Sequence, residues 1–484
     1  MLFNSADFFI FFPVVAWLAY AVPRSWRWLL LLVASSVFYA WFVPAYLAIL
    51  GGMILLDYCT GLLIARSTGR WRRLWLLASL TGNLGLLAVF KYWNFAVANS
   101  AAIGGWLGIA ANWPTLRLIL PIGLSFHTFQ AMSYTIEVYR GRFAPERHLG
   151  YFALYVMFFP QLVAGPIERP HNLLPQLRAN PPLDYGRVVE GLRLMLGGLL
   201  MKMLIADGLA IPVDWVYARP AEFTGPALVL ATTLFAFQIY CDFAGYTFIA
   251  LGAARVLGVN LTPNFHNPFL ATSVSNYWQR WHISLTSWFR DYVYEPLTKG
   301  ALSMGKARLA IIFVFLLSGL WHGASWTFVA WGGLHGFYLV LGNLTWRIRH
   351  RLLGALGLGE GHWMLAFSRP LAVFGLVSLS FVFFRANSVA DASYIFMHLF
   401  TGWGSLEAIR HQLTLAGAST SFLTFALVEI AGVLVFAVLN ERGLITAESA
   451  INPWWLRWGA YCGAVALIAG WGSFGSRPFV YFQF

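Results

Sequence analysis

Charged residues are scarce in this 484-residue chain: 11% of its residues are Asp, Glu, Lys or Arg, whereas 59% are hydrophobic. A soluble globular domain carries about 25% charged residues, so this composition excludes that class of protein. Apolar runs of about 20 residues, the length that crosses a bilayer, recur from the N-terminal region to the C-terminal region. The chain is therefore expected to be an integral membrane protein embedded in a lipid bilayer.

Cysteine is also rare, and several catalytic motifs are missing. Cys59, Cys241 and Cys462 form no CxxC pair, so neither a disulfide framework nor a structural zinc site is indicated, and no metal is expected. The HExxH sequence of zinc proteases, the GxSxG nucleophile elbow and the P-loop do not occur. No histidine is followed five positions later by aspartate, which excludes the HxxxxD arrangement of soluble-faced glycerolipid acyltransferases.

Positive charge exceeds negative charge, with a formal net charge of +13, and the arginines cluster in short loops. Such loops orient membrane helices and contact anionic lipid, so nucleic-acid binding is not expected. If the basic loops at 24–27 and 66–73 both face the cytoplasm, residues 28–65 form a hairpin that turns near Pro44, and the N-terminus lies on the opposite, outer side of the membrane. The first apolar run, 8–22, has no basic segment before it and no cleavage site, and reads as a retained helix.

The apolar runs predict an all-α membrane protein with about ten to thirteen membrane segments, including short re-entrant ones. Sequence repeats of fixed period and low-complexity tracts are absent, which favours a single membrane-embedded domain over residues 1–484. The predicted helices are 5–22, 28–43, 45–65, 74–90, 116–139, 150–165, 188–210, 225–258, 308–321, 325–345, 364–384, 421–440 and 455–472.

Basic residues flank the segment 308–346 on both sides, which predicts that it enters the membrane and returns to the same face. His322 falls just before its midpoint. At about 1.5 Å per residue, the helix before it reaches roughly 21 Å into a ~30 Å hydrocarbon core. A histidine at that depth is a functional-site hypothesis by default. Trp321 and Gly323 flank it, and the glycine is expected to let a ligand or a second backbone approach the imidazole.

A second polar cluster is WQRWHISLTSWFRD, residues 278–291, in a region without a clean apolar window. If it is one helix, His282 shares a face with Trp278, Leu285 and Phe289, whereas Arg280 and Ser284 point away. The cluster is interpreted either as an interfacial helix or as the mouth of a site. His335 lies 13 residues after His322, about 20 Å along a continuous helix, and is interpreted as a packed or interhelical hydrogen-bonding residue.

A deep histidine with apolar walls suits one reaction in particular. A neutral imidazole can remove a proton from an alcohol that attacks an activated acyl group. The oxyanion that forms needs donors, which Trp or Asn side chains or a free backbone N–H could supply. The residues thus favour acyl transfer to a hydroxyl, with His322 as the base.

Seven stretches in order resemble the membrane-bound O-acyltransferase family, and within it the bacterial alginate O-acetylase branch. They are LLLLVASSVFYAW (29–41), LPIGLSFHTFQAMSYTIEVYRG (120–141), FFPQLVAGPIERP (158–170), IYCDFAGYTFIALG (239–252), NFHNPFLATSVSNYWQRWHISLTSWFRDYVYEPL (264–297), LSGLWHGASWTFVAWGGLHG (317–336) and PFVYFQF (478–484). The chain departs from the family at Cys241 and in YEPLTKGALSMGKAR, where relatives have a bulky apolar residue and a glycine-rich segment.

The resemblance implies a multi-helix fold with a funnel or tunnel, in which His322 is catalytic and His282 is a second functional histidine. The tunnel or substrate-binding residues are expected to be Trp278, Arg280, Trp281, Arg290, Asp291, Trp321, Gly323 and Asp242. It also implies a bacterial inner-membrane enzyme with no bound cofactor. Such enzymes take an acyl group from a cytoplasmic thioester such as acetyl-CoA and deliver it to an exported polysaccharide, often through a periplasmic acetyltransferase partner.

Two other functions stay open at this point. The same fold could transfer D-alanine from a carrier protein to teichoic polymers, although the matches to alginate-type segments at both ends argue against that substrate. A transporter of glycan precursors could line its path with histidines and arginines. The sequence lacks the repeat pair and matched broken helices typical of many transporters, which disfavours this alternative.

Overall fold

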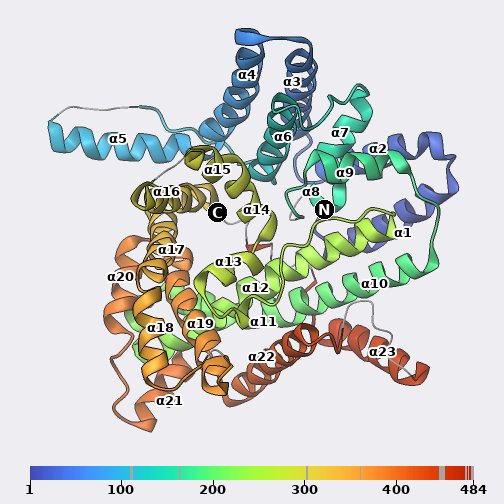
Figure 1. Cartoon of the computed structure of the whole chain (residues 1–484). Helices are drawn as coiled ribbons and strands as arrows, with labels where there is room; N and C mark the ends of the chain where they lie inside the picture. The colour runs from blue at the N-terminus through green and yellow to red at the C-terminus, as the bar shows by residue number, and fades with distance from the viewer. Residues whose placement is uncertain are drawn as a thin grey trace. The chain divides into compact units, whose positions relative to one another are not determined.

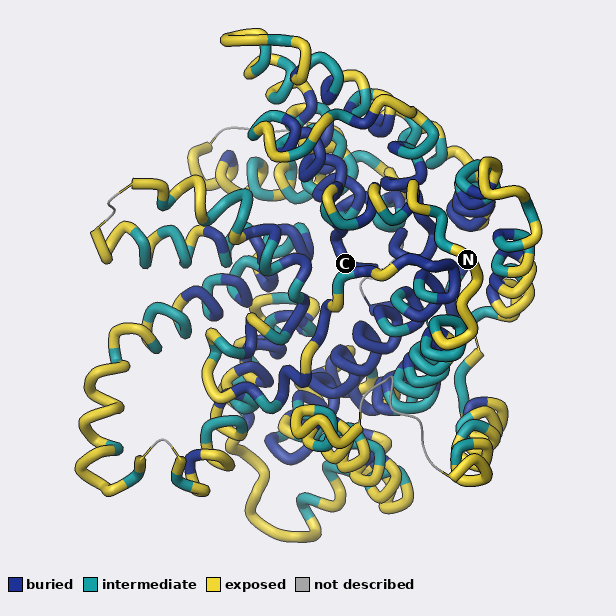
Figure 2. The backbone as a smooth tube through the Cα atoms, turned by 45° about the vertical axis from the view of Figure 1, so that its right-hand side comes forward, coloured by how far each residue is buried: buried dark blue, intermediate teal, exposed yellow. Residues whose placement is uncertain are grey.

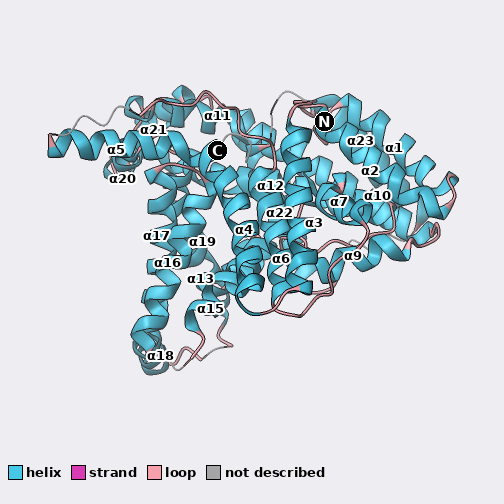
Figure 3. Ribbon diagram, turned by 90° about the horizontal axis from the view of Figure 1, so that it is seen from above, coloured by secondary structure: helices cyan, strands magenta, loops and turns pink. Residues whose placement is uncertain are grey.

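A computed structural model describes residues 1–108, 113–162, 165–300, 303–359, 361–445, 453–474, 477 and 479–480. Within these ranges all regular secondary structure is helical (Figure 3). The all-α prediction is confirmed. Parts of two quoted motifs, residues 163–164 and most of the tail 478–484, lie outside the described residues.

The chain divides into two compact units, each built from two stretches of sequence. Unit 1 comprises Met1–Gly197 and Tyr246–Pro263, and unit 2 comprises Gly198–Gly245 and Asn264–Phe484. The boundary at Gly245 falls inside one long helix, α12, which therefore contributes to both units. The prediction of a single domain over 1–484 is not decided by this division and stays a prediction.

Unit 1 is a set of packed helices in which α3, α4 and α6 lie side by side (Figure 1). Pro44 lies in the loop between α2 and α3, whereas the hairpin 28–65 across the membrane stays a prediction. Asp57 of α3 is fully buried and accepts hydrogen bonds from Ser79 and Asn83 of α4, so this charge has polar partners. The helices are α1 Ala6–Ala21, α2 Arg27–Ala40, α3 Tyr46–Arg66, α4 Gly69–Leu87, α5 Trp93–Leu107, α6 Leu124–Tyr139, α7 Leu149–Met157, α8 Phe159–Leu162, α9 Pro170–Ala179 and α10 Tyr185–Leu199, with η1 Arg24–Trp26 and η2 Ala88–Tyr92.

Unit 2 is built around a helical hairpin, α16 and α17, against which α19 packs (Figure 1). Arg308 near the start of α16 donates a 3.2 Å hydrogen bond to Asn343 near the end of α17, so the segment 308–346 folds back on itself. Its entry into the membrane and return to the same face stay a prediction. Its helices are α11 Asp207–Ala218, α12 Gly225–Val256, α13 Val274–Arg280, α14 Ile283–Phe289, α15 Glu295–Thr298, α16 Met304–His322, α17 Trp326–Leu344, α18 Trp346–Ala355, α19 Trp363–Arg385, α20 Val389–His398, α21 Leu406–Leu415, α22 Thr420–Glu441 and α23 Trp454–Trp471, with η3 Leu200–Ala206, η4 Pro220–Glu222, η5 Pro268–Leu270 and η6 Arg290–Tyr294.

Seven helices in the described residues are long and apolar enough to cross a membrane, and α1 is a shorter apolar helix. The spans are Tyr46–Arg66, Gly69–Leu107, Tyr185–Ala218, Gly225–Val256, Met304–His322, Trp363–Arg385 and Thr420–Glu441. Other predicted segments form helices that are too short, such as α2, α6 and α7. The chain is a multi-pass membrane protein.

The seven spans differ in how much protein surrounds them. Figure 2 shows buried residues in dark blue, running in long stretches along some helices while other helices are mostly exposed. The apolar window of α12 is 83% buried, whereas that of α22 is 11% buried. Polar side chains on α12 must therefore find partners within the protein, because neither water nor lipid headgroups reach them.

Candidate active site

The polar stretch 278–291 is broken at His282, where α13 has ended and α14 begins. His282 has a left-handed backbone, with φ 42° and ψ 53°, a conformation that residues other than glycine adopt rarely. The neighbouring segment 264–266 holds this break in place. The Ile283 N–H donates to the Asn264 carbonyl (3.0 Å), and the Ser284 hydroxyl donates to the Asn264 side-chain oxygen (2.6 Å).

The single-helix interpretation of this stretch was therefore wrong in part. Trp278, His282, Leu285 and Phe289 are all buried, as predicted. Ser284, however, is buried as well, because the break turns α14 so that its first residues face Asn264. Sequence periodicity could not show the break, since a strained left-handed residue is stabilised here by contacts from a separate segment.

His322 is the last residue of α16 and is 4% exposed. Aromatic rings surround it, with the centroids of Trp331 at 5.0 Å and of Phe384 at 5.4 Å. The expected role of Gly323 needs correction: a Cβ at this position would collide with the Phe328 ring. The glycine thus admits a neighbouring side chain of α17, and the chain folds back tightly just after His322.

The two histidines lie close together although they are 40 positions apart in sequence. Their ring centroids are 6.4 Å apart, and Trp321 lies 6.0 Å from the His282 ring. Phe243 of α12 contacts the other side of His282, with an edge-on ring at 4.7 Å. Burial lowers the pKa of His282 to about 3, so this imidazole is neutral at pH 7.

His335 is confirmed as a packed, hydrogen-bonded residue. Its ring accepts a hydrogen bond from the Trp278 indole N–H (3.3 Å) and is 2.8 Å from the Ser380 hydroxyl. The separation of about 20 Å assumed a continuous helix, but the helix ends at His322 and α17 returns along α16. A single ring, Trp331, therefore contacts both His322 (5.0 Å) and His335 (4.9 Å).

The charged residues of the stretch have partners other than the histidines. Arg280 forms a two-pronged ion pair with Glu441 at the end of α22, with distances of 2.8 and 2.9 Å. Arg290 pairs with its neighbour Asp291 at 2.9 Å, and its side chain is 62% exposed. Trp281 is buried and stacks on Tyr277 (5.5 Å). A role of these residues in lining a tunnel stays a prediction.

The Arg280–Glu441 pair lends itself to a direct measurement. We expect a double-mutant cycle of Arg280→Gln and Glu441→Gln to give a coupling free energy of about 1 kcal/mol, because a two-pronged pair that is only part-exposed exceeds most surface pairs. Unfolding midpoints of the purified protein would supply the cycle. If the changes in midpoint of the two single variants add up to the change of the double variant, the pair does not stabilise the contact between α22 and residues 278–291.

Asp242 lies on α12 and is 1% exposed. It forms an ion pair with Lys202 (2.7 Å), which also contacts Asp207 at 2.7 Å, and it accepts a hydrogen bond from the Val480 N–H. Lys202 was not among the residues predicted for the site. A signal was present, because a lone lysine inside the apolar run LLMKMLIADG requires an acidic partner.

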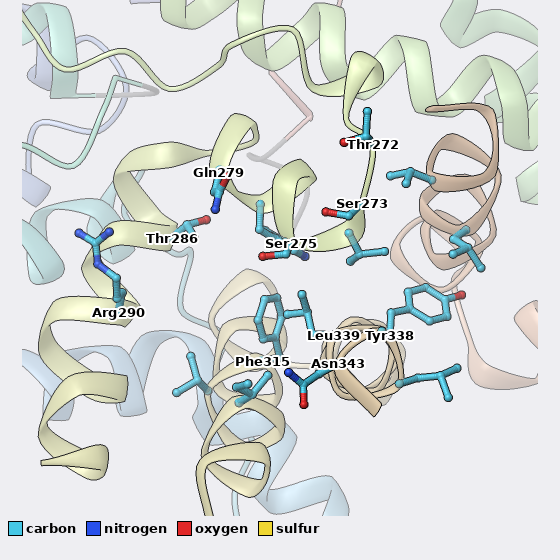
Figure 4. A pocket seen from close by; sticks show the side chains of 18 of the residues that line it. Thr272, Ser273, Ser275, Gln279, Thr286, Arg290, Phe315, Tyr338, Leu339 and Asn343 are labelled. Carbon is cyan, nitrogen blue, oxygen red and sulfur yellow. The ribbon is translucent and has the colours of Figure 1, made fainter. Parts of the chain in front are cut away.

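A cavity of about 990 Å³ lies within unit 2 (Figure 4), and its lining includes chain neighbours of the two histidines but neither His282 nor His322. Ser275, Gln279 and Thr286 line one side and Phe315, Leu339 and Asn343 the other (Figure 4). Its inner wall includes Ser318, one turn before His322, and Ile283, next to His282. Arg290, Arg349 and Arg369 are also part of the lining. The described residues contain no group of three His, Cys, Asp or Glu that could hold a metal ion.

Comparison with known proteins finds relatives named as O-acetylases or O-acetyltransferases that match most of the chain. The profile of the membrane-bound O-acyltransferase family matches residues 146–352, which contain both histidines. A probable alginate O-acetylase AlgI of Pseudomonas putida is 34% identical over 100% of both chains, and one of Azotobacter vinelandii is 35% identical over 93% of this chain and 88% of its own. A peptidoglycan O-acetyltransferase of Helicobacter pylori is 31% identical over 81% of this chain and 78% of its own. This chain therefore belongs to the membrane-bound O-acyltransferase family.

Proposed function

We propose that this O-acyltransferase moves an acetyl group from a cytoplasmic thioester across the bacterial inner membrane to a hydroxyl of an exported polysaccharide or to a periplasmic transferase partner. The observation that carries the proposal is the meeting of His282 and His322, two buried histidines from separate elements, 6.4 Å apart and walled by aromatic rings. Buried imidazoles suit proton transfer away from bulk water.

In the proposed reaction, His322 accepts the proton of the acceptor hydroxyl as its oxygen attacks the thioester carbonyl carbon. A C–O bond forms, the C–S bond breaks, and the proton passes from the imidazole to the departing thiolate. Burial lowers the pKa of His282 and makes its imidazole a weak base, so we assign it to hydrogen bonding and orientation of the acceptor. The aromatic walls exclude water that would otherwise hydrolyse the thioester.

The cavity is the proposed site of the donor. Its apolar inner wall, including Phe315 and Val314, suits a thioester arm, and its arginines suit the phosphates of acetyl-CoA. Arg349 lies on α18, which is rich in arginine and exposed, as expected of a cytoplasmic loop. Independently of α18, the basic loops at 24–27 and 66–73 support a proposed periplasmic N-terminus.

The proposal is tested with purified protein in detergent or nanodiscs. Labelled acetyl-CoA and a labelled acyl-carrier thioester are offered in parallel, each with and without a polysaccharide acceptor. We expect acetyl-CoA to be consumed and its label to move to the acceptor, or to the periplasmic partner when that protein is added. Consumption of the carrier-bound group alone would reject acetyl-CoA as donor, and movement of a glycan precursor without any acyl consumption would reject the enzyme.

A further inference from the structure

Three residues near the C-terminus, Ser473, Arg477 and Val480, each form a hydrogen bond to an earlier segment of unit 2. The Ser473 N–H donates to the Met203 carbonyl (3.1 Å). Arg477 donates to Asp214 at 2.8 Å, a carboxylate that also pairs with Arg385. The Val480 N–H donates to Asp242 at 2.7 Å.

The third hydrogen bond, from Val480 to Asp242, is unusual because its acceptor is a buried carboxylate. Lys202, Asp207 and Asp242 have side chains exposed by 3% or less, and the single lysine contacts one oxygen of each carboxylate at 2.7 Å. One positive charge thus faces two negative charges. The second oxygen of Asp242 takes the Val480 N–H, and such a charge-assisted bond is about twice as strong as a neutral one.

Ring contacts connect this hydrogen bond to His282. Phe243 follows Asp242 on α12 and contacts Phe479, which precedes Val480, at 5.4 Å. Two adjacent residues of α12 therefore hold two adjacent residues of the C-terminus. The Phe243 ring is also the one that contacts His282 at 4.7 Å. Phe479 is fully buried and packs against the Phe243 ring that contacts His282.

Stability alone does not account for the charged group. Replacing a buried ion pair with apolar residues of similar volume is often neutral or stabilising, so such pairs are weak evidence for stability. A buried carboxylate does, however, fix the position of a backbone N–H that would otherwise have no partner in an apolar interior.

We propose that Asp242 is a positioning residue, which holds Phe479 and Val480 against Phe243 and so fixes the wall of the active site behind His282. Lys202 forms an ion pair with Asp242, and Asp207 contacts the same ammonium group and helps to fix its position. The proposal rests on the proposed function for its catalytic part, whereas its structural part can be measured without turnover.

The test uses the full chain with Cys59→Ser and Cys462→Ser, which remove the two exposed cysteines, and with Val480→Cys as a reporter. This reporter keeps its backbone N–H. We expect slow maleimide labelling when Asp242 is present and labelling at least about tenfold faster with Asp242→Ala, because a freed chain end opens locally. Asp242→Asn keeps an acceptor oxygen and is expected to restore most of the protection.

Turnover is measured in parallel in the native-cysteine background. Asp242→Ala is expected to lower kcat by about tenfold to a hundredfold, the effect of a small misplacement near the reacting groups, with less change in KM for the thioester. Asp242→Asn should lose clearly less. Val480→Pro removes the donor N–H and leaves the charged side chains in place, although it also fixes the backbone φ angle, and it should reproduce the kcat loss if Asp242→Ala proves unstable.

Two results would overturn the proposal: protection of Val480→Cys that survives Asp242→Ala, or faster labelling without loss of kcat. Failure of the proposed function gives a different pattern. If the wild-type protein turns over no thioester while labelling still responds to Asp242→Ala, the structural part of the proposal stands and its catalytic part is rejected together with the proposed function.

Discussion

Replacing His322 with alanine is expected to lower acyl transfer by about 10² to 10⁴, the usual contribution of a positioned general base. The imidazole is buried among Trp321, Trp331 and Phe384, so water cannot easily take over its role. Single-turnover consumption of labelled acetyl-CoA by purified protein would measure the loss, because it separates the chemical step from product release. His411→Ala, on the exposed face of α21, is the matched control.

His282 is expected to respond differently from His322. We choose His282→Asn, since asparagine tolerates the left-handed backbone found at this position. This variant should weaken acceptor use more than donor consumption, if His282 orients the acceptor and His322 takes the proton. Equal and complete loss of donor consumption in both variants would contradict this division of roles, and an active His322→Ala protein with a normal unfolding midpoint would reject His322 as the base.

Gly332→Ala is expected to destabilise the protein by about 3 kcal/mol, at the upper end of the range for overpacking. A Cβ at Gly332 would collide with the Phe315 carbonyl and approach the Gly319 nitrogen to 3.1 Å. These are backbone atoms, which cannot rotate away as a side chain can. Since α16 and α17 meet here, separating them would also displace His322.

The matched control for Gly332→Ala is Gly342→Ala, on the same helix. A Cβ at Gly342 has no atom within 4 Å outside its own turn, so the variant should be neutral or more stable by up to about 1 kcal/mol, the helix propensity difference between alanine and glycine. Unfolding midpoints in detergent would compare the two. Equal midpoints would show that α16 and α17 can separate without loss.

Sequence reasoning predicted the helices well where a long apolar run was enough. The segments 45–65 and 364–384 correspond closely to α3 and α19, and the folding back of segment 308–346 was predicted from its basic flanks. It failed at Gly323, where the expected ligand space holds the Phe328 ring, and in the stretch 278–291, where the assignment of faces assumed one helix and the structure has two. In both places a residue from elsewhere in the chain decides the local structure.

In the candidate site, too, the sequence predicted single residues and the contacts between distant segments decided how they are arranged. Motif resemblance and the cost of a membrane histidine singled out His322 and His282 as separate residues. Their proximity depends on Asn264, which holds the break at His282, and on the turn after His322. The partners of the charged residues were likewise unpredictable, because Glu441 is 161 positions from Arg280 and Val480 is 238 from Asp242.

By itself, the sequence determined that this chain is a helical multi-pass membrane protein and which histidines carry the resemblance to acyltransferases. Hydropathy and helix length are local properties, so they can be read along the chain. Only the tertiary structure decided that the two histidines share a site, that Arg280 pairs with Glu441, and that the chain end is held beside His282. These contacts arise when distant segments pack together, and no local pattern specifies which buried charge will meet which partner.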